Sequence, residues 1–115
     1  MKNQRYTENK HIALTAVAAV EGGAPVKIGQ YVGVALNKAA IGEKVTIWLD
    51  GSYDVTVTGA IASEGSIVYI KTDNTLTTTR AAAFEFGVAN GTKGAGAGVV
   101  EVAPFGKITT IAALA

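Results

Sequence analysis

The sequence contains no cysteine, only two prolines, one histidine and one tryptophan among its 115 residues. Without cysteine, neither a disulfide framework nor a thiolate metal site can form, so stability must come from packing and assembly. A lone histidine, His11, excludes a metal site built on two histidines of one chain. We expect His11 to be a surface or edge residue, and we expect no metal site.

The chain also lacks a charge surplus and a long apolar run. Ten basic and nine acidic residues give a net charge of +1, which offers no electrostatic footprint for nucleic acid or for an anionic membrane. No stretch approaches the roughly 18 apolar residues of a membrane span, and the polar start MKNQRYTENKH lacks the apolar centre of a secretory signal. The sequence therefore predicts a protein made in the cytoplasm that binds neither nucleic acid nor membrane.

Short segments with a period of two dominate what is present. They are rich in Val, Ile, Thr and aromatic residues and are separated by Gly, Asn, Asp or Pro, which is typical of strands and turns. These segments are HIALTA, PVKI, QYVGVAL, KVTIWL, YDVTVT, SIVYIK, TLTTT, FEFGVA, GVVEV and KITTI. The alanine-rich stretches TAVAAVEGG and NKAAIGE are short and flanked by glycine, so we interpret them as loops. The pattern predicts an all-β fold.

One order of motifs occurs twice. Glu-Gly, a strand, Gly-Val-Ala, a loop of small residues and a valine-rich strand follow one another from residue 21 and again from residue 64, where the insert KTDNTLTTTRAAAFE lengthens the second copy. Two copies are too few for a solenoid. We therefore expect a small closed β-barrel or sandwich with two pseudo-repeated halves, formed by a single domain over residues 11–115, with an extended N-terminal arm over residues 1–10.

The glycines are better explained by backbone geometry than by phosphate binding. Residues 91–98, GTKGAGAG, do not match G-x-G-x-x-G, and no helix pattern follows to provide an N-terminal dipole. We interpret this segment as a flexible hairpin loop. The two Gly-Val-Ala sequences, which begin at Gly33 and Gly87, are expected to let a strand pass close to its neighbour.

A hairpin is expected around Leu49-Asp50-Gly51, with Gly51 in the left-handed conformation. A three-residue loop would pair Ile47 with Tyr53. It collects the apolar residues on one face, and the predicted core face is Val45, Ile47, Tyr53, Val55 and Val57. Trp48 then points to the opposite face, where either a loop of the same chain or a neighbouring subunit covers it.

Catalytic patterns are sparse. The acidic residues fall mostly in turns or on alternating strand faces, where solvated carboxylates are common, and the serines lack the context of a nucleophile elbow. We expect no catalytic residue, no cofactor and no enzymatic activity.

The order IALTA…GGAPVKIGQYVGVALNKAAIGEKVTIWLDGSYDV, then SEGSIVYIK…TLTTT, then FGVA and a glycine loop before VVEV resembles a known family. It is similar to the small capsid cement or head-decoration proteins of tailed bacteriophages, some of which carry a "RecA/RadA-type recombinase" label. The resemblance spans roughly residues 8–103. It implies a β-barrel protein on the outer surface of the expanded capsid, bound to the major capsid protein as a homotrimer at three-fold and quasi-three-fold positions.

Contacts with the capsid or with other copies are expected in the polar arm, at exposed aromatic residues and in the apolar tail. The candidates are Arg5, Tyr6, Glu8, Trp48, Phe105 and Ile111. For the tail, a closing strand of the same barrel and a strand between subunits both remain open. The alternative function is a small ligand-binding β-barrel on the virion surface, for glycan or single-stranded nucleic acid, although the few aromatic residues are scattered.

Overall fold

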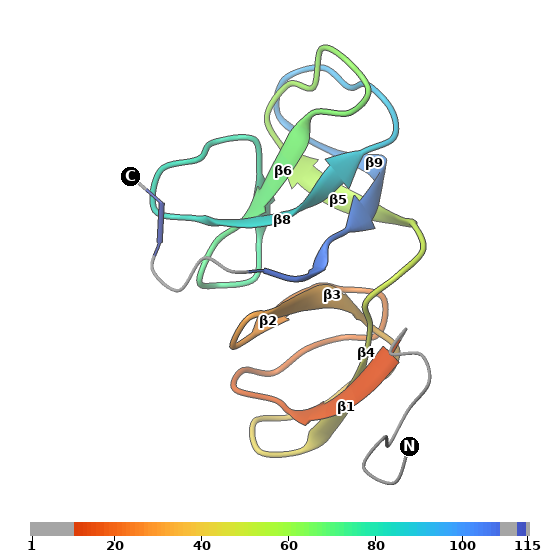
Figure 1. Cartoon of the computed structure of the whole chain (residues 1–115), viewed down its shortest axis with the longest axis vertical. Helices are drawn as coiled ribbons and strands as arrows, with labels where there is room; N and C mark the ends of the chain where they lie inside the picture. Colours follow the sequence, from red (N-terminus) through yellow and green to blue (C-terminus); the bar gives the residue numbers. More distant parts are fainter. Residues whose placement is uncertain (1–10, 109–112, 115) are drawn as a thin grey trace, which may run out of the picture.

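The computed structural model describes residues 11–108 and 113–114, and it contains ten strands and no helix in that part of the chain (Figure 1). The strands are β1 (His11–Thr15), β2 (Pro25–Ile28), β3 (Tyr31–Ala35), β4 (Lys44–Trp48), β5 (Tyr53–Thr58), β6 (Ile67–Ile70), β7 (Leu76–Thr77), β8 (Phe84–Ala89), β9 (Ala97–Pro104) and β10 (Gly106–Lys107). The all-β prediction is confirmed, and the two alanine-rich stretches are loops as expected.

The strands form two sheets, one for each half of the chain. In the first sheet, β1, β4, β3 and β10 lie side by side and β2 pairs with β3, so β10 is the one strand of this sheet that comes from the second half of the chain. In the second half, β5, β7, β6, β8 and β9 pair in a closed ring. Figure 1 shows the two halves one above the other, with β3 facing the second half. The second half is closed into a ring, whereas the first half is an open sheet, and the two packed sheets fit the sandwich of the prediction.

The predicted repeat is present in the strand pairing. The order β1-β4-β3-β2 corresponds to β5-β9-β8-β6, and every pairing in both sets is antiparallel. Even the isolated bridges correspond, because Val20 pairs with Ala39 where Ile61 pairs with Lys93. Each half is therefore one copy of the same four-stranded unit.

The Gly-Val-Ala sequences occupy equivalent positions, and both glycines are required by close approach. A Cβ on Gly33 would lie 2.2 Å from the carbonyl oxygen of Trp48, and a Cβ on Gly87 would lie 2.2 Å from that of Ala103. Real Cβ atoms do not approach backbone oxygens so closely, so any side chain would push the strands apart. The prediction that glycine lets neighbouring strands pass closely is confirmed.

The insert in the second copy supplies β7. This strand runs parallel to β5 and antiparallel to β6, and it completes the ring. In the first half, a turn at Gly29-Gln30 joins the strands that correspond to β6 and β8, so the chain provides no equivalent of β7 there. The longer connection, residues 71–83, is what closes the second half.

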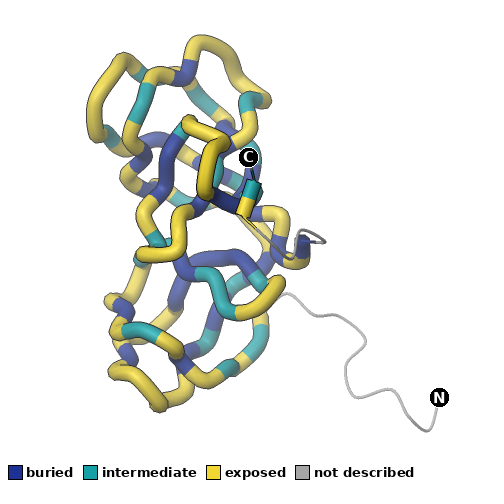
Figure 2. Tube along the Cα trace, turned by 90° about the vertical axis from the view of Figure 1, so that its left-hand side faces the viewer, coloured by how far each residue is buried: buried dark blue, intermediate teal, exposed yellow. Residues whose placement is uncertain are grey.

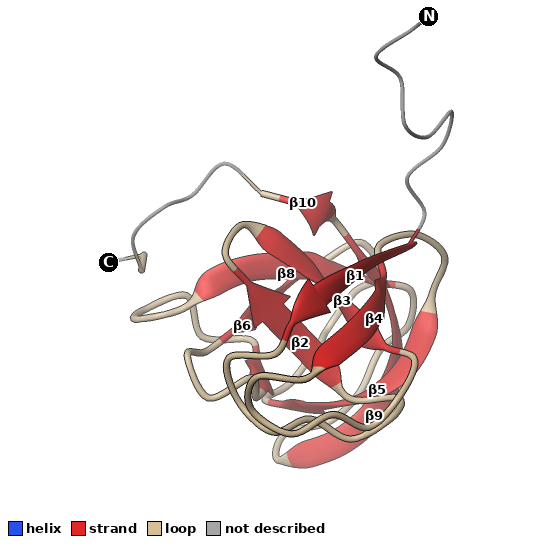
Figure 3. Ribbon diagram, turned by 90° about the horizontal axis from the view of Figure 1, so that it is seen from below, coloured by secondary structure: helices blue, strands red, loops and turns tan. Residues whose placement is uncertain are grey.

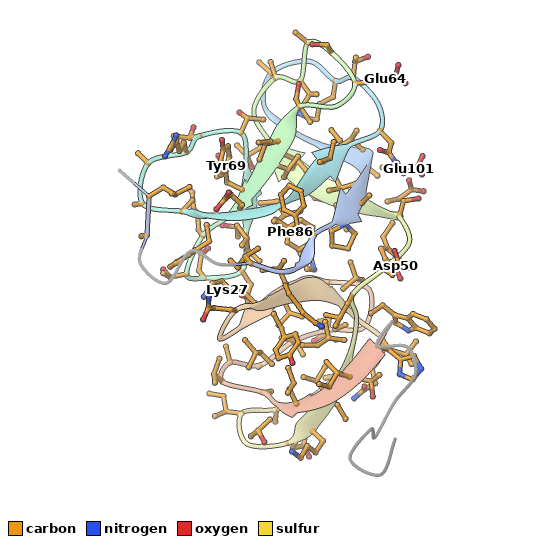
Figure 4. The ribbon with its side chains drawn as sticks, viewed as in Figure 1. Lys27, Asp50, Glu64, Tyr69, Phe86 and Glu101 are labelled. Atoms are coloured by element: carbon orange, nitrogen blue, oxygen red, sulfur yellow. The ribbon has the colours of Figure 1, made fainter. Side chains whose placement is uncertain are left out.

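The buried residues form two clusters (Figure 2). The larger cluster fills the second half around Phe86, whose ring lies inside the barrel (Figure 4). Val32 and Val34 of β3 belong to this larger cluster, whereas Ala35 and Ile47 belong to the cluster of the first half. Because β3 contributes to both clusters, it joins the halves through a shared apolar interface.

The predicted hairpin at residues 49–51 is wrong. β4 pairs with β1 and β3, and β5 pairs with β7 and β9, so the two strands do not pair with each other. Leu49 to Ser52 instead connect the two halves. Both strands alternate in a way that fits a hairpin, but each buries its apolar face against partners that are more distant in sequence.

Other parts of that prediction are confirmed. Gly51 has a φ of +89°, and the Tyr53 hydroxyl donates a hydrogen bond of 2.6 Å to the Asp50 carbonyl. The inward-facing residues Val45, Ile47, Val55 and Val57 are all buried, and Tyr53 is partly buried against the larger cluster. Trp48 lies on the face opposite to Val45 and Ile47, as predicted. Alternation therefore identified the faces correctly although it assigned the wrong partner.

Candidate interaction surfaces

Trp48 lies on the outer face of β4 and is partly exposed. Its ring packs against the His11 imidazole with centroids 4.9 Å apart and an interplanar angle of 57°. This pair stands at the start of β1, where His11 lies opposite Trp48 across the two neighbouring strands, and Figure 3 shows β1 beside β4 from below. The role of Trp48 in binding stays a prediction.

Phe105 is 43% exposed although both of its neighbours, Pro104 and Gly106, are buried. Its N–H donates to the Phe86 carbonyl at 2.8 Å, which holds the backbone of this residue against β8. The structure therefore leaves Phe105 available as an aromatic contact. The remaining candidates lie outside the described residues and also stay predictions; these are Arg5, Tyr6, Glu8 and Ile111.

Sequence reasoning missed several exposed aliphatic residues. The largest exposures are those of Ile41, Val17, Val99 and Leu36. Val17 directly follows Ala16, and Ile41 directly precedes Gly42. The Gly42 N–H donates a hydrogen bond of 2.9 Å to the Ala16 carbonyl, so the two loops are hydrogen-bonded to each other. The alanine-rich loops carry no periodicity that could separate the exposed Val17 from Val20, which is buried in the same loop.

A row of apolar residues crosses the outer face of the second half. Ile67, Val88 and Ala103 are neighbours across β6, β8 and β9, and all three are partly or well exposed. The corresponding residue to Val88 in the first half is Val34, which is only 4% exposed because it packs into the core of the second half. The same position of the repeated unit is thus an interface in one half and open in the other.

A polar cluster lies on the outer face of the barrel near β9. The Ser52 hydroxyl donates a short hydrogen bond to the Glu101 carboxylate, and the Asn90 amide donates a second one at 3.4 Å. These hydrogen bonds stabilise the ionised form, so the pKa of Glu101 lies below its ordinary value of 4.5. Figure 4 shows Glu101 at the edge of the molecule, pointing into solvent rather than into a cavity.

The glycine loop between β8 and β9 is organised around a lysine. The Lys93 ammonium donates hydrogen bonds to the carbonyls of Gly59, Gly94 and Gly96 at 2.6, 2.7 and 2.7 Å. A phosphate cradle directs N–H groups at an anion, whereas this loop directs carbonyl oxygens at a cation. The segment is therefore a hairpin loop, as expected, and its own lysine holds its backbone.

A cleft of 410 Å³ lies between the halves. The turn before β2, the outer side of β5 and the start of β7 line it, with polar groups from Asp54, Thr56, Thr58 and Asn74. None of its lining residues is aromatic, and aromatic stacking is what binds sugar rings and bases in small β-barrels. Its single carboxylate, Asp54, has no second acid beside it among the lining residues for acid–base chemistry. The cleft offers little support for a glycan or nucleic-acid site.

Lys27 lies at the junction between the halves (Figure 4). Its backbone N–H donates to the Asn74 side-chain oxygen at 3.2 Å, and its ammonium stands 4.0 Å from the centre of the Phe84 ring. Burial lowers the pKa of this lysine. One residue of β2 therefore contacts both the insert and the barrel of the second half.

Within residues 11–108 and 113–114, no set of three or more His, Asp or Glu side chains gathers closely enough to hold a metal ion. The same residues include no helix with the length and apolar character needed to cross a bilayer.

The comparisons with known proteins address the family. Comparison with curated proteins gave no match, and comparison with solved structures gave none. The family model of the phage cement protein matches residues 6–104, which is most of the chain and includes both halves of the repeat. This match confirms the resemblance found in the motif order. The chain belongs to the phage cement protein family, whose members are structural proteins of the phage capsid.

Proposed function

We propose that this protein binds the outer surface of the expanded capsid as a homotrimer at three-fold and quasi-three-fold positions and stabilises the shell. The observation that carries the proposal is the family match over residues 6–104. The proposal also implies that the protein acts by binding alone, without catalysis. Its partners are the major capsid protein and further copies of itself.

The distribution of polarity supports a protein partner. A net charge of +1 suits a contact with protein rather than with genome, and several large aliphatic or aromatic side chains are exposed. They are Val17, Leu36, Ile41, Ile67, Val99 and Phe105. Because these residues lie on both halves, the chain has apolar surface for more than one neighbour.

The physical effect follows from linkage. A protein that binds only the expanded lattice stabilises that state by mass action. In a trimer, docking of one protomer holds the other two at high effective concentration, so each contact can be weak. A stable interface still needs on the order of 800 Å² from each partner. The row Ile67, Val88 and Ala103 is apolar surface that self-association could cover, and Val34, the counterpart of Val88 in the first half, already packs against the other half.

Two measurements test the proposal. Light scattering on the purified protein is expected to give three times the mass of the 11.7 kDa chain. Co-sedimentation is expected to show saturable binding to expanded heads and little binding to unexpanded heads, together with a higher melting temperature of the decorated heads. Equal binding to both forms of the head, or no binding, would contradict the proposal, and a monomeric mass with saturable binding would remove only the trimer.

A further inference from the structure

Asn90 and Gly91 follow β8 and begin the glycine loop, and they form the one Asn-Gly pair in the sequence. Both residues lie in a bend, and Asn90 is exposed. An asparagine side chain is open to attack at Cγ by the backbone nitrogen of the next residue. Glycine obstructs this attack least, because it has no Cβ and its backbone adopts more conformations than that of other residues. The pair therefore has the composition and the exposure of a site of chemical modification.

The hydrogen bonds around this pair leave the attacking nitrogen free. The Asn90 N–H donates to the Glu101 carbonyl at 2.8 Å. The Lys93 N–H donates to the Ile61 carbonyl at 3.0 Å. Between them, the Gly91 N–H has no hydrogen-bond acceptor among the described residues. The Asn90 side chain is also held weakly, because the hydrogen bond from its amide to the Glu101 carboxylate is 3.4 Å long. Rotation within the bend can therefore bring the Gly91 nitrogen to Cγ of Asn90.

The two other asparagines in the described part of the chain are better protected. The Asn37 side-chain oxygen accepts from the Thr46 N–H at 2.9 Å, and its nitrogen donates to the carbonyl of the next residue at 3.1 Å. The nitrogen that could attack Asn74 belongs to Thr75, whose N–H donates to the Asp73 carboxylate at 3.1 Å. The residue after each of these asparagines also carries the Cβ that glycine lacks. Of the described asparagines, Asn90 is therefore the most reactive.

We propose that Asn90-Gly91 is a self-modification site, at which Asn90 converts to aspartate and isoaspartate and its hydrogen bond to Glu101 becomes a repulsion. The Gly91 nitrogen loses its proton to hydroxide and bonds to Cγ of Asn90. The C–N bond of the side-chain amide breaks, and its nitrogen takes a proton from water and leaves as ammonia. One water molecule then opens the succinimide ring, at the side-chain carbonyl to give aspartate or at the backbone carbonyl to give isoaspartate. This inference does not depend on the proposed function.

The new carboxylate would lie beside an existing one. The amide nitrogen that it replaces is 3.4 Å from a carboxylate oxygen of Glu101. In the unreacted chain, hydrogen bonds from Ser52 and Asn90 lower the pKa of Glu101. After the reaction the Asn90 donor is gone and a like charge faces Glu101, so the pKa of Glu101 rises. The net charge of the chain falls by one unit, from +1 to zero.

The isoaspartate product also lengthens the main chain by one atom at the start of the glycine loop. β8 ends at Ala89, and the bridge to Ile61 is made by Lys93, which follows soon after the reacting pair. The Lys93 ammonium also donates to three glycine carbonyls. An extra atom between residues 90 and 91 displaces the residues that follow relative to these contacts. We therefore expect the loop over residues 91–98 to loosen in the isoaspartate form.

Ageing of the full-length protein in mildly alkaline buffer tests the site. Peptide mapping by mass spectrometry should find the reaction at Asn90 on the order of tenfold faster than at Asn37 or Asn74, at a rate that rises with pH. Gly91→Ala is the matched variant, because its Cβ would lie in ordinary contact, 3.5 Å from a Val100 methyl group. It should fold normally and react on the order of tenfold more slowly. Equal rates at the three asparagines, or an unchanged rate in Gly91→Ala, would overturn the proposal.

Variants at the same position test the consequence separately. Asn90→Asp reproduces one product, and carboxyl NMR shifts should show a higher pKa of Glu101 than in the unmodified protein. Asn90→Ala is the control, because it removes the donor without adding a charge, and it should raise the pKa of Glu101 less. Aged chains purified with isoaspartate at residue 90 should show faster amide exchange over residues 93–98. The same Glu101 pKa in Asn90→Asp and Asn90→Ala would overturn the proposed repulsion, and unchanged exchange would overturn the loosening of the loop.

Discussion

The two halves of the molecule share four strands in the same order and with the same antiparallel pairing, yet only the second half closes into a ring. The difference lies in one connection: residues 71–83 contain β7, whereas Gly29-Gln30 makes a tight turn. The closed half buries a larger cluster around Phe86, and the open half keeps partly exposed aliphatic residues along β1 and β2. Among the described residues, a single added strand separates a closed ring from an open sheet.

The largest expected effect comes from the position that both halves share. Gly33→Val and Gly87→Val would each place a side chain against a backbone oxygen that lies 2.2 Å from the ideal Cβ. We expect each variant to lose about 3 kcal/mol or more of unfolding free energy in urea titrations, because the strands must separate. Gly94→Ala is the control, since nothing lies within 4 Å of its Cβ position. A stable Gly33→Val protein would show that the first half tolerates wider strand spacing.

The next pair of variants compares how much corresponding residues of the closed and the open half contribute to the free energy of unfolding. Val55→Ala removes a buried side chain of the closed half and should cost about 2 kcal/mol, whereas Leu14→Ala removes a larger but partly exposed side chain and should cost about 1 kcal/mol. Chemical denaturation of both variants gives the comparison. If Leu14→Ala were the more destabilising, another part of the molecule would cover β1 in solution.

A smaller difference in stability between the halves is expected at Lys93, because the corresponding residue of the first half, Ala39, is a buried core residue. Lys93→Met removes three hydrogen bonds from an ammonium group and should cost about 1 kcal/mol, with faster amide exchange confined to residues 94–98. Lys44→Met, at an exposed lysine of the first half, should change neither quantity. Faster exchange in both halves would show that the glycine loop supports the whole fold.

The smallest expected effect is a loss of stability at low pH that depends on the Glu101 carboxylate. Because the folded-state pKa of Glu101 is lowered, its contribution to stability is present above pH 4.5 and is lost as the pH falls through the lowered pKa. Ser52→Ala should raise the pKa of Glu101 toward 4.5, as followed by carboxyl NMR shifts, because Ser52 provides the main hydrogen bond. Asn90→Ala should raise it less. An unchanged pKa in Ser52→Ala would mean that the hydroxyl points elsewhere in solution.

Sequence reasoning succeeded where the determining interactions are local. Alternation located the strands and their buried faces, and the two Gly-Val-Ala sequences revealed the repeat because each glycine meets the same steric demand. It failed at residues 49–51, since alternation defines a face but not the partner strand. The segment TLTTT was recognised as a strand, but its place between β5 and β6 depends on contacts distant in sequence. Exposed residues such as Ile41 were missed because no periodicity marks an outer surface.

The loop that holds Glu64 lies at the end of the molecule farthest from β1 (Figure 4), and Ala62, Ser63 and Glu64 are all exposed. An epitope or enzyme spliced between Ala62 and Ser63 would interrupt neither the ladder of the barrel nor the contacts of Lys93. If the first half faces the shell, such a passenger would project outward from the particle. The molecule would then serve as a ready adaptor for displaying foreign polypeptides on intact heads.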